Sequence, residues 1–183
     1  SFCNLVLNKM IMTAAHKAFY SLITVLLSFV LLTAFDRSQI QMIELNKPLD
    51  LPMILSGTFG ELRGNHFHAG IDIKTQGRIG FPVHTVDKGY VSRIKVSPYG
   101  FGKTVYINHP NGITSVYAHL DDFSPRIKSY AYDLMRNNQS NEIDQYLEAD
   151  EIPLNEKELI GYSGNSGGSM GPHLHFELRE SDL

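Results

Sequence analysis

Two strand-like segments, residues 103–109 and 113–119, flank a Pro-Asn-Gly tripeptide at 110–112, and this pair constrains the fold more than any other feature. Both segments are rich in β-branched and aromatic residues, which favour strands. Asn-Gly supplies the positive φ angles that a tight turn needs. We therefore expect the two segments to be antiparallel neighbours in a sheet.

Further segments have the same strand-like character, and Gly-rich turns separate them. They are residues 81–86, 89–96, 159–163 and 173–179. Short strands at this spacing are typical of antiparallel β domains. The sequence therefore predicts a mostly β fold with an antiparallel, two-sheet architecture.

Residues 124–148 break this pattern. Ser124 can cap a helix whose first position is Pro125, and apolar residues recur at helical spacing over 127–134. A second short helix is expected over residues 143–147. We interpret 124–148 as a helical insertion between two strands, which either packs on the domain or covers a groove.

An uncharged apolar run, residues 18–35, follows Lys9 and Lys17 and ends at Asp36. A basic start, an apolar centre and a polar exit are typical of an export signal. As a helix the run would be about 27 Å long, close to the ~30 Å hydrocarbon core, so an uncleaved anchor is the second interpretation. A buried core helix is disfavoured because the run has no amphipathic period.

These features divide the chain into three parts. The first residue is Ser1, so we expect the natural protein to start at Met10 or Met12, and we expect a truncated C-terminus after Leu183. The parts are a signal peptide or membrane anchor with an apolar helix at 1–35, a linker at 36–50 and the folded domain at 51–183.

Charge and cysteine content exclude two classes of protein. The net charge is −3 and no block of consecutive basic residues occurs, so binding to nucleic acid through phosphate contacts is not expected. The single cysteine, Cys3, allows neither a disulfide framework within the chain nor a Cys-rich metal site.

The first motif with candidate chemistry joins His68 to Asp72. In an extended chain with a bend at Gly70, these side chains point to one side. A neutral imidazole and a carboxylate are both good zinc ligands. Alone, this spacing is a weak signal, because it occurs by chance.

The second motif is His173 and His175, which share one face of the predicted strand 173–179. The apolar residues that alternate with them, as far as Leu178, are expected to face the core. This alternation would hold both imidazoles on a rigid strand, as a metal or catalytic site requires.

His119 is the third element, and we expect it on the same face of its strand as Tyr117. Two histidines and one carboxylate leave the fourth position of a tetrahedral zinc site open for water, whose pKa zinc lowers. Amide hydrolysis also needs a base and an oxyanion donor, which two further histidines can supply. The remaining isolated histidines are expected to be ordinary core or surface residues: His16, His84 and His109.

At these residues the sequence closely resembles the lysostaphin-type, or LytM-like, zinc metallopeptidases, which are peptidoglycan endopeptidases. The matching blocks span nearly the whole predicted domain, and ordered blocks are far more specific than any single motif. They are residues 66–72, 80–83, 117–120 and 161–177.

The resemblance implies one Zn²⁺ per domain and a role for each motif residue. It implies His68, Asp72 and His175 as zinc ligands. It implies His119 and His173 as the catalytic pair that activates water and stabilises the tetrahedral intermediate. The implied fold is an antiparallel β-sandwich, or barrel-sandwich hybrid, with a central groove.

The resemblance also places loop 163–167 along a wall of that groove. His66 shares the face of His68 and competes as a ligand, but His68 is favoured because it keeps the four-residue spacing to Asp72. The candidate substrate-binding residues are His66, Tyr117, Ser163, Asn165 and Ser166.

The implied function is a zinc-dependent endopeptidase that hydrolyses peptide bonds in bacterial peptidoglycan cross-links or stem peptides. Its partners would be peptidoglycan peptides, with membrane contact only through the N-terminal segment. Export would place it in the cell envelope or periplasm, or anchored to the inner membrane. The alternatives are a non-catalytic module that binds or activates a cell-wall amidase, and a metal-free phosphocarrier. A complete ligand set and the export segment argue against them.

Overall fold

The structure, a computed structural model, describes residues 16, 19, 21–26, 44–64 and 66–181. The chain divides into two compact units, Ser1–Glu44 and Leu45–Leu183. The second unit holds all the β-strands of the described chain.

In the first unit, the described residues 16, 19 and 21–26 are helical, and all of them except the partly exposed Ile23 are exposed. The rest of the predicted apolar run 18–35 lies outside the described residues. Among the residues that are described, no helix has the length and apolar character to cross a bilayer. The N-terminal apolar helix therefore stays a prediction.

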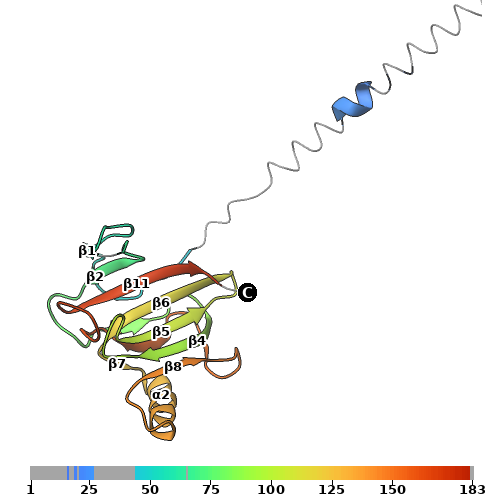
Figure 1. The fold of residues 1–183 in the computed structure, drawn as a ribbon. Coiled ribbons are helices and arrows are strands. Elements are labelled where there is room, and N and C mark those ends of the chain that lie inside the picture. Colours follow the sequence, from blue (N-terminus) through green and yellow to red (C-terminus); the bar gives the residue numbers. More distant parts are fainter. Residues whose placement is uncertain (1–15, 17–18, 20, 27–43, 65, 182–183) are drawn as a thin grey trace, which may run out of the picture. The chain divides into compact units, whose positions relative to one another are not determined.

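The larger of two antiparallel sheets has eight strands and carries the predicted hairpin at its centre (Figure 1). The hairpin forms as predicted, and the His109 N–H donates to the Ile113 carbonyl across the turn, but only Gly112 of the Asn-Gly pair has a positive φ, +79°. In spatial order the strands are β1 (Leu55–Gly57), β2 (Ile71–Lys74), β11 (His173–Glu180), β6 (Ile113–Leu120), β5 (Lys103–Asn108), β4 (Gly89–Val96) and β8 (Ile143–Tyr146), with β9 (Pro153–Leu154) beside β4.

The smaller sheet has three strands, in the order β3 (Pro82–His84), β10 (Leu159–Tyr162) and β7 (Asp122–Phe123). Side chains of both sheets meet in one hydrophobic core, in which Val83 and Ile160 of the small sheet and Ile94 and Leu174 of the large sheet are fully buried. The prediction of a mostly β fold with two antiparallel sheets is confirmed.

The insertion between β7 and β8 contains one helix, α2 (Pro125–Asn137), which begins at Pro125 after Ser124 as predicted. Its Ile127 and Ala131 are buried in the core, so the helix is a packing element next to β7 and β8 (Figure 1). The predicted second helix over 143–147 is wrong, because residues 143–146 form β8 and pair with β4.

Residues 45–50 belong to the domain rather than to the predicted linker 36–50. Leu49 is fully buried and forms an isolated antiparallel bridge with Val83 of β3. A side chain of this size contributes about 1.5–3 kcal/mol when it leaves water, which ties the segment to the core. The domain therefore starts at Leu45, ahead of the predicted start at 51.

Candidate metal centre

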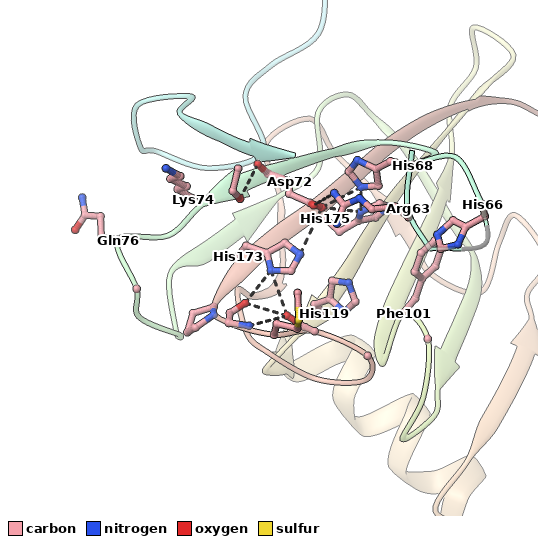
Figure 2. A pocket seen from close by; sticks show the side chains of 18 residues that line it. Arg63, His66, His68, Asp72, Lys74, Gln76, Phe101, His119, His173 and His175 are labelled. Carbon is pink, nitrogen blue, oxygen red and sulfur yellow. Dashed lines mark hydrogen bonds and ion pairs between the residues drawn. The ribbon is translucent and has the colours of Figure 1, made fainter. Parts of the chain in front are cut away.

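A groove of about 810 Å³ runs along the large sheet where β2, β11 and β6 lie side by side (Figure 2). The polar side chains at its centre are the five singled out by the sequence motifs: His68, Asp72, His119, His173 and His175. Four of them are under 9% exposed, and His173 is partly exposed. The fold thus brings the two motifs and the third histidine together.

Three ligand atoms converge within this cluster. His68 Nε2 lies 3.1 Å and His175 Nδ1 lies 2.9 Å from Asp72 Oδ1, and the two nitrogens are 3.0 Å apart. The register of the sheet causes this convergence, because His175 on β11 is the direct partner of Asp72 on β2. Zinc–ligand bonds of about 2.0–2.2 Å in a tetrahedral site place ligand atoms roughly 3.3 Å apart, so the observed triangle needs only a small expansion.

The outer nitrogen of each candidate ligand is fixed by an acceptor. His68 Nδ1–H donates to the Thr58 carbonyl at 2.9 Å, and His175 Nε2–H donates to Glu177 Oε1 at 2.8 Å. Both imidazoles therefore turn their inner nitrogen toward Asp72 Oδ1, and a proton or a metal cation must lie between the three atoms to offset the repulsion of their lone pairs. The donor set fits a divalent metal such as Zn²⁺, with the outer hydrogen bonds that orient metal-binding histidines.

Asp72 is held in its charged form. Burial alone would raise the pKa of Asp72, but hydrogen bonds from His173, His175 and Arg63 outweigh it and hold the pKa well below its usual range. Arg63 Nη2 lies 2.8 Å from Asp72 Oδ2, the oxygen that faces away from the triangle. The carboxylate is therefore oriented and ionised before a metal arrives.

Glu177 is a functional residue that the sequence predictions missed. It lies on β11 on the same face as His173 and His175, is 1% exposed, and is paired with both His175 and Arg179. Burial would raise the pKa of Glu177, but these two partners lower it. Extending the two-residue alternation of the histidines by one step would have found this side chain.

Replacing Glu177 with alanine is expected to weaken zinc binding by about 10–100-fold, because His175 loses the acceptor that orients its ring. A buried imidazole N–H without an acceptor also costs about 1–3 kcal/mol of folding free energy. Competition against a chelator measures the first effect and thermal denaturation the second. Zinc affinity equal to that of the unaltered chain would show that Glu177 does not orient the site.

A β-bulge turns His119 into the groove. Between β5 and β6, Val105 pairs with Tyr117 and Lys103 pairs with Leu120, so Ala118 and His119 together oppose one residue. His119 takes φ +57° at this point. Because an extra residue shifts the alternation, His119 and Tyr117 do not share a face, and the prediction that they do is wrong.

His119 and His173 face each other across the groove, with ring centroids 4.8 Å apart. His119 Nδ1–H donates to the Ser166 carbonyl at 2.8 Å, and His173 Nδ1–H to the Gly171 carbonyl at 2.8 Å. Burial lowers the pKa of His119 to about 4, although the Ser166 carbonyl opposes this shift. His119 is thus a neutral imidazole near pH 7 with Nε2 available to accept a proton.

The candidate substrate-binding residues lie in different places. His66 lines the groove near Arg63 and is exposed, whereas Tyr117 is fully buried and accepts a hydrogen bond from the Val86 N–H. Tyr117 therefore supports the core and cannot touch a ligand in the groove.

Residues of loop 163–167 do not line the groove, and the hydrogen bonds of Ser163 and Ser166 support segments that do. Ser163 is fully buried and accepts from the Phe81 N–H, Ser166 accepts from the Lys103 N–H, and Asn165 is exposed. The segment that lines the groove is its continuation, residues 168–172. Contact with a ligand by Ser163, Asn165 or Ser166 is thus not supported by their positions, although the Ser166 carbonyl orients His119.

The exposure of Leu178 also differs from the prediction. Leu174 and Phe176 face the core as predicted, but Leu178 is 46% exposed because the core ends before the end of β11.

Gly70, the predicted bend, lies against β11: a Cβ there would come within 2.3 Å of the Phe176 carbonyl oxygen. This close approach lets the chain bring His68 over the strand that carries His175.

The groove of this antiparallel β domain gathers two histidines and an aspartate around one point, and this arrangement could hold a divalent metal ion. Residues 66–139 match the family described as Peptidase family M23. The resemblance to this peptidase family that the motifs predicted is thereby confirmed.

Relatives of known name share part of the chain. DD-carboxypeptidase/endopeptidase Mpg of Neisseria meningitidis serogroup B is 33% identical over 112 residues, which are 61% of this chain and 20% of that protein. Peptidoglycan DD-endopeptidase ShyA of Vibrio cholerae is 32% identical over 111 residues, with the same two shares, 61% and 20%. The chain thus spans about a fifth of the length of the curated relatives it matches.

A solved structure, a zinc containing peptidase from Vibrio cholerae, has a similar fold. Its TM-score to this chain is 0.55 with 23% sequence identity, and the match covers 75% of this chain and 37% of the other. At this identity the likeness shows a common fold.

Proposed function

We propose that the domain is a zinc-dependent endopeptidase that hydrolyses peptide bonds in bacterial peptidoglycan cross-links or stem peptides. The observation that carries this proposal is the convergence of His68, Asp72 and His175 in a groove that also holds two further histidines. The names of the relatives, a DD-carboxypeptidase/endopeptidase and a peptidoglycan DD-endopeptidase, support the substrate class.

His68, Asp72 and His175 would hold the zinc. When bound, zinc polarises the scissile carbonyl and lowers the pKa of water. His119 is placed to accept the proton of the attacking water, because its imidazole is neutral and its Nε2 faces the groove.

His173 is placed for the complementary role. Its Nδ1–H donates to the Gly171 carbonyl, and its Nε2, on the other side of the ring, lies 3.4 Å from Asp72 Oδ1 beside the candidate ligands. An N–H donor at this position would stabilise the negative charge that develops on the carbonyl oxygen. The two histidines thus divide acid and base roles between opposite sides of the groove.

Removing the metal from the purified domain with a chelator is expected to stop cleavage of defined peptidoglycan fragments, and one equivalent of Zn²⁺ is expected to restore it. Zinc should also raise the unfolding temperature, because a ligand that binds only the folded state stabilises it. Mass spectrometry of the products identifies the bond that is cut. A zinc-loaded domain that cleaves no peptidoglycan preparation would refute the proposal.

We also propose that the domain acts outside the cytoplasm, in the bacterial envelope. The support is the sequence pattern of residues 18–35 and the wall-acting names of the relatives. Fractionation of cells that produce the full-length protein, followed by N-terminal sequencing, would distinguish a cleaved signal peptide from a retained anchor.

A further inference from the structure

Lys74 is a charged residue of the groove that the metal centre does not use. It follows Asp72 by two positions on β2, so both side chains are on the same face of the strand. It is the direct partner of His173 on β11, and its backbone N–H donates to the Ile54 carbonyl of the neighbouring chain segment. Its Cα is therefore held firmly beside the candidate catalytic centre.

The charges around the groove leave Lys74 without an acidic partner. Arg63, the other cationic side chain that lines the groove, forms ion pairs with Asp72 and Glu61. Across the residues that the structure describes, Lys74 forms no ion pair, and its side chain is exposed. An ammonium group that forms no ion pair with a carboxylate of its own groove offers its charge to a ligand.

Figure 2 shows where this charge lies along the groove. Lys74 and Gln76 lie on one side of His173, and Phe101 and His66 lie beyond the metal centre on the other side. One end of the groove is therefore cationic and amide-bearing, and the other is aromatic. A peptide bound along this groove would place different groups at the two ends.

The reach of Lys74 sets which part of a peptide it can touch. Residues two apart on a strand are separated by about 6.8 Å, and an extended peptide advances by about 3.3–3.6 Å per residue. The Cα of Lys74 is therefore about two peptide residues along the strand from Asp72, and its flexible side chain can reach a group near a bond held over the centre formed by His68, Asp72 and His175.

We propose that Lys74 is a specificity-determining residue that binds a carboxylate of the substrate peptide, located within about two residues of the bond that is cut. This inference rests on the proposed peptidase function. The carboxylate has two sources in a peptide, the C-terminal carboxylate of a stem or the side-chain carboxylate of a residue within it. An ammonium group binds either of them.

Two pairs of peptides test the inference on the zinc-loaded domain. One pair differs only in a C-terminal carboxylate or carboxamide, and the other only in a side-chain carboxylate or carboxamide next to the cleaved bond. We expect the unaltered domain to cleave the acid of one pair with a kcat/KM about tenfold above that of its amide. A tenfold ratio corresponds to an interaction stronger than a typical exposed ion pair and weaker than a typical hydrogen bond to a charged group. The pair that responds identifies the source of the carboxylate.

Lys74→Met keeps the length of the side chain and removes its charge. This substitution should lower kcat/KM about tenfold for the acid of the responsive pair. The kcat/KM for the matching amide should stay within about twofold, and the zinc content should not change. Lys74→Arg should retain the preference for the acid. Lys47→Met, at an exposed lysine outside the groove, is the matched control and should behave like the unaltered domain. The acid preference should also decrease as ionic strength rises.

Equal ratios of acid to amide cleavage in the unaltered domain and in Lys74→Met, for both pairs, would overturn the assignment. Calorimetric titration with the same peptides separates this failure from failure of the proposed function. If the domain cleaves no peptide but binds one acid more tightly than its amide, and Lys74→Met loses that difference, the carboxylate site stands. If the acid and the amide bind equally tightly, the assignment of a carboxylate site to Lys74 is wrong.

Discussion

Replacement of His175 with alanine is expected to remove bound zinc and peptidase activity together. His175 supplies one of the three converging ligand atoms, 2.9 Å from Asp72 Oδ1. Structural zinc sites with four ligands bind with about 10–16 kcal/mol, so one ligand corresponds to roughly 10²–10³-fold in affinity. His68 and Asp72 alone would then not retain the metal through purification, and cleavage should fall below detection.

Zinc content by elemental analysis and cleavage of defined peptidoglycan fragments measure the two effects on the same preparation. His84→Ala is the matched control, because His84 is on β3 of the small sheet and outside the groove. It should keep one zinc and full activity. A His175→Ala domain that keeps one tightly bound zinc would show that the metal has another ligand set, and the centre described here would be wrong.

The strands were predictable because their signals are local. Residues 89–96 and 159–162 form strands almost exactly where β-branched and aromatic content predicts them, and the Asn-Gly turn fixes the central hairpin. Sheet membership was not predictable, since pairing depends on distant segments. β3 and β4 are consecutive in the chain, yet they lie in different sheets.

The error at residues 143–147 has the same origin. Apolar side chains at Ile143, Tyr146 and Leu147 have a spacing that suits a helix, and periodicity over so few residues does not distinguish a helix from a strand. These residues form a strand because they pair with the edge of β4. Ile143 pairs with Val96, and Asp144 accepts two hydrogen bonds from Arg93 at 2.6 and 2.7 Å. Tertiary contacts thus override the local pattern.

The candidate ligand set was predictable from the motifs and the family resemblance together, whereas its supporting groups were not. Alternation on β11 places His173 and His175 on one face, and sheet register then brings Asp72 opposite His175. The Thr58 carbonyl that orients His68 belongs to a loop with no recognisable motif. Arg63 precedes Asp72 by nine positions, at a spacing that predicts no contact.

The sequence preference for His68 over His66 as candidate ligand, made from the four-residue spacing to Asp72, agrees with the fold. Both have plausible sequence positions, but His68 is 6% exposed with its Nε2 in the triangle, and His66 is exposed at the groove. The bulge that carries His119 is the strongest departure from local rules. A positive φ at a residue other than glycine is uncommon, and sequence gives no sign of it.

Replacement of His119 is expected to separate catalysis from metal binding. His119→Ala should lower kcat by about 10²–10⁴-fold, the usual contribution of a positioned general base, and should leave one zinc per domain. The residue lies beside the candidate ligands: its ring centroid is 5.9 Å from that of His175, and its Nδ1–H donates to the Ser166 carbonyl. Single-turnover cleavage of a defined fragment measures the loss of kcat, and elemental analysis of the same sample measures the retained zinc.

His119→Gln is the control for a loss of structure. Its amide can still donate to the Ser166 carbonyl, but it cannot accept a proton at neutral pH. A base role requires both variants to be slow and both to keep zinc. The same variants decide between a peptidase and a non-catalytic module that activates an amidase. Such a module needs the surface of the groove and not its proton chemistry, so full biological function in cells that carry His119→Gln would favour the activator and count against the peptidase.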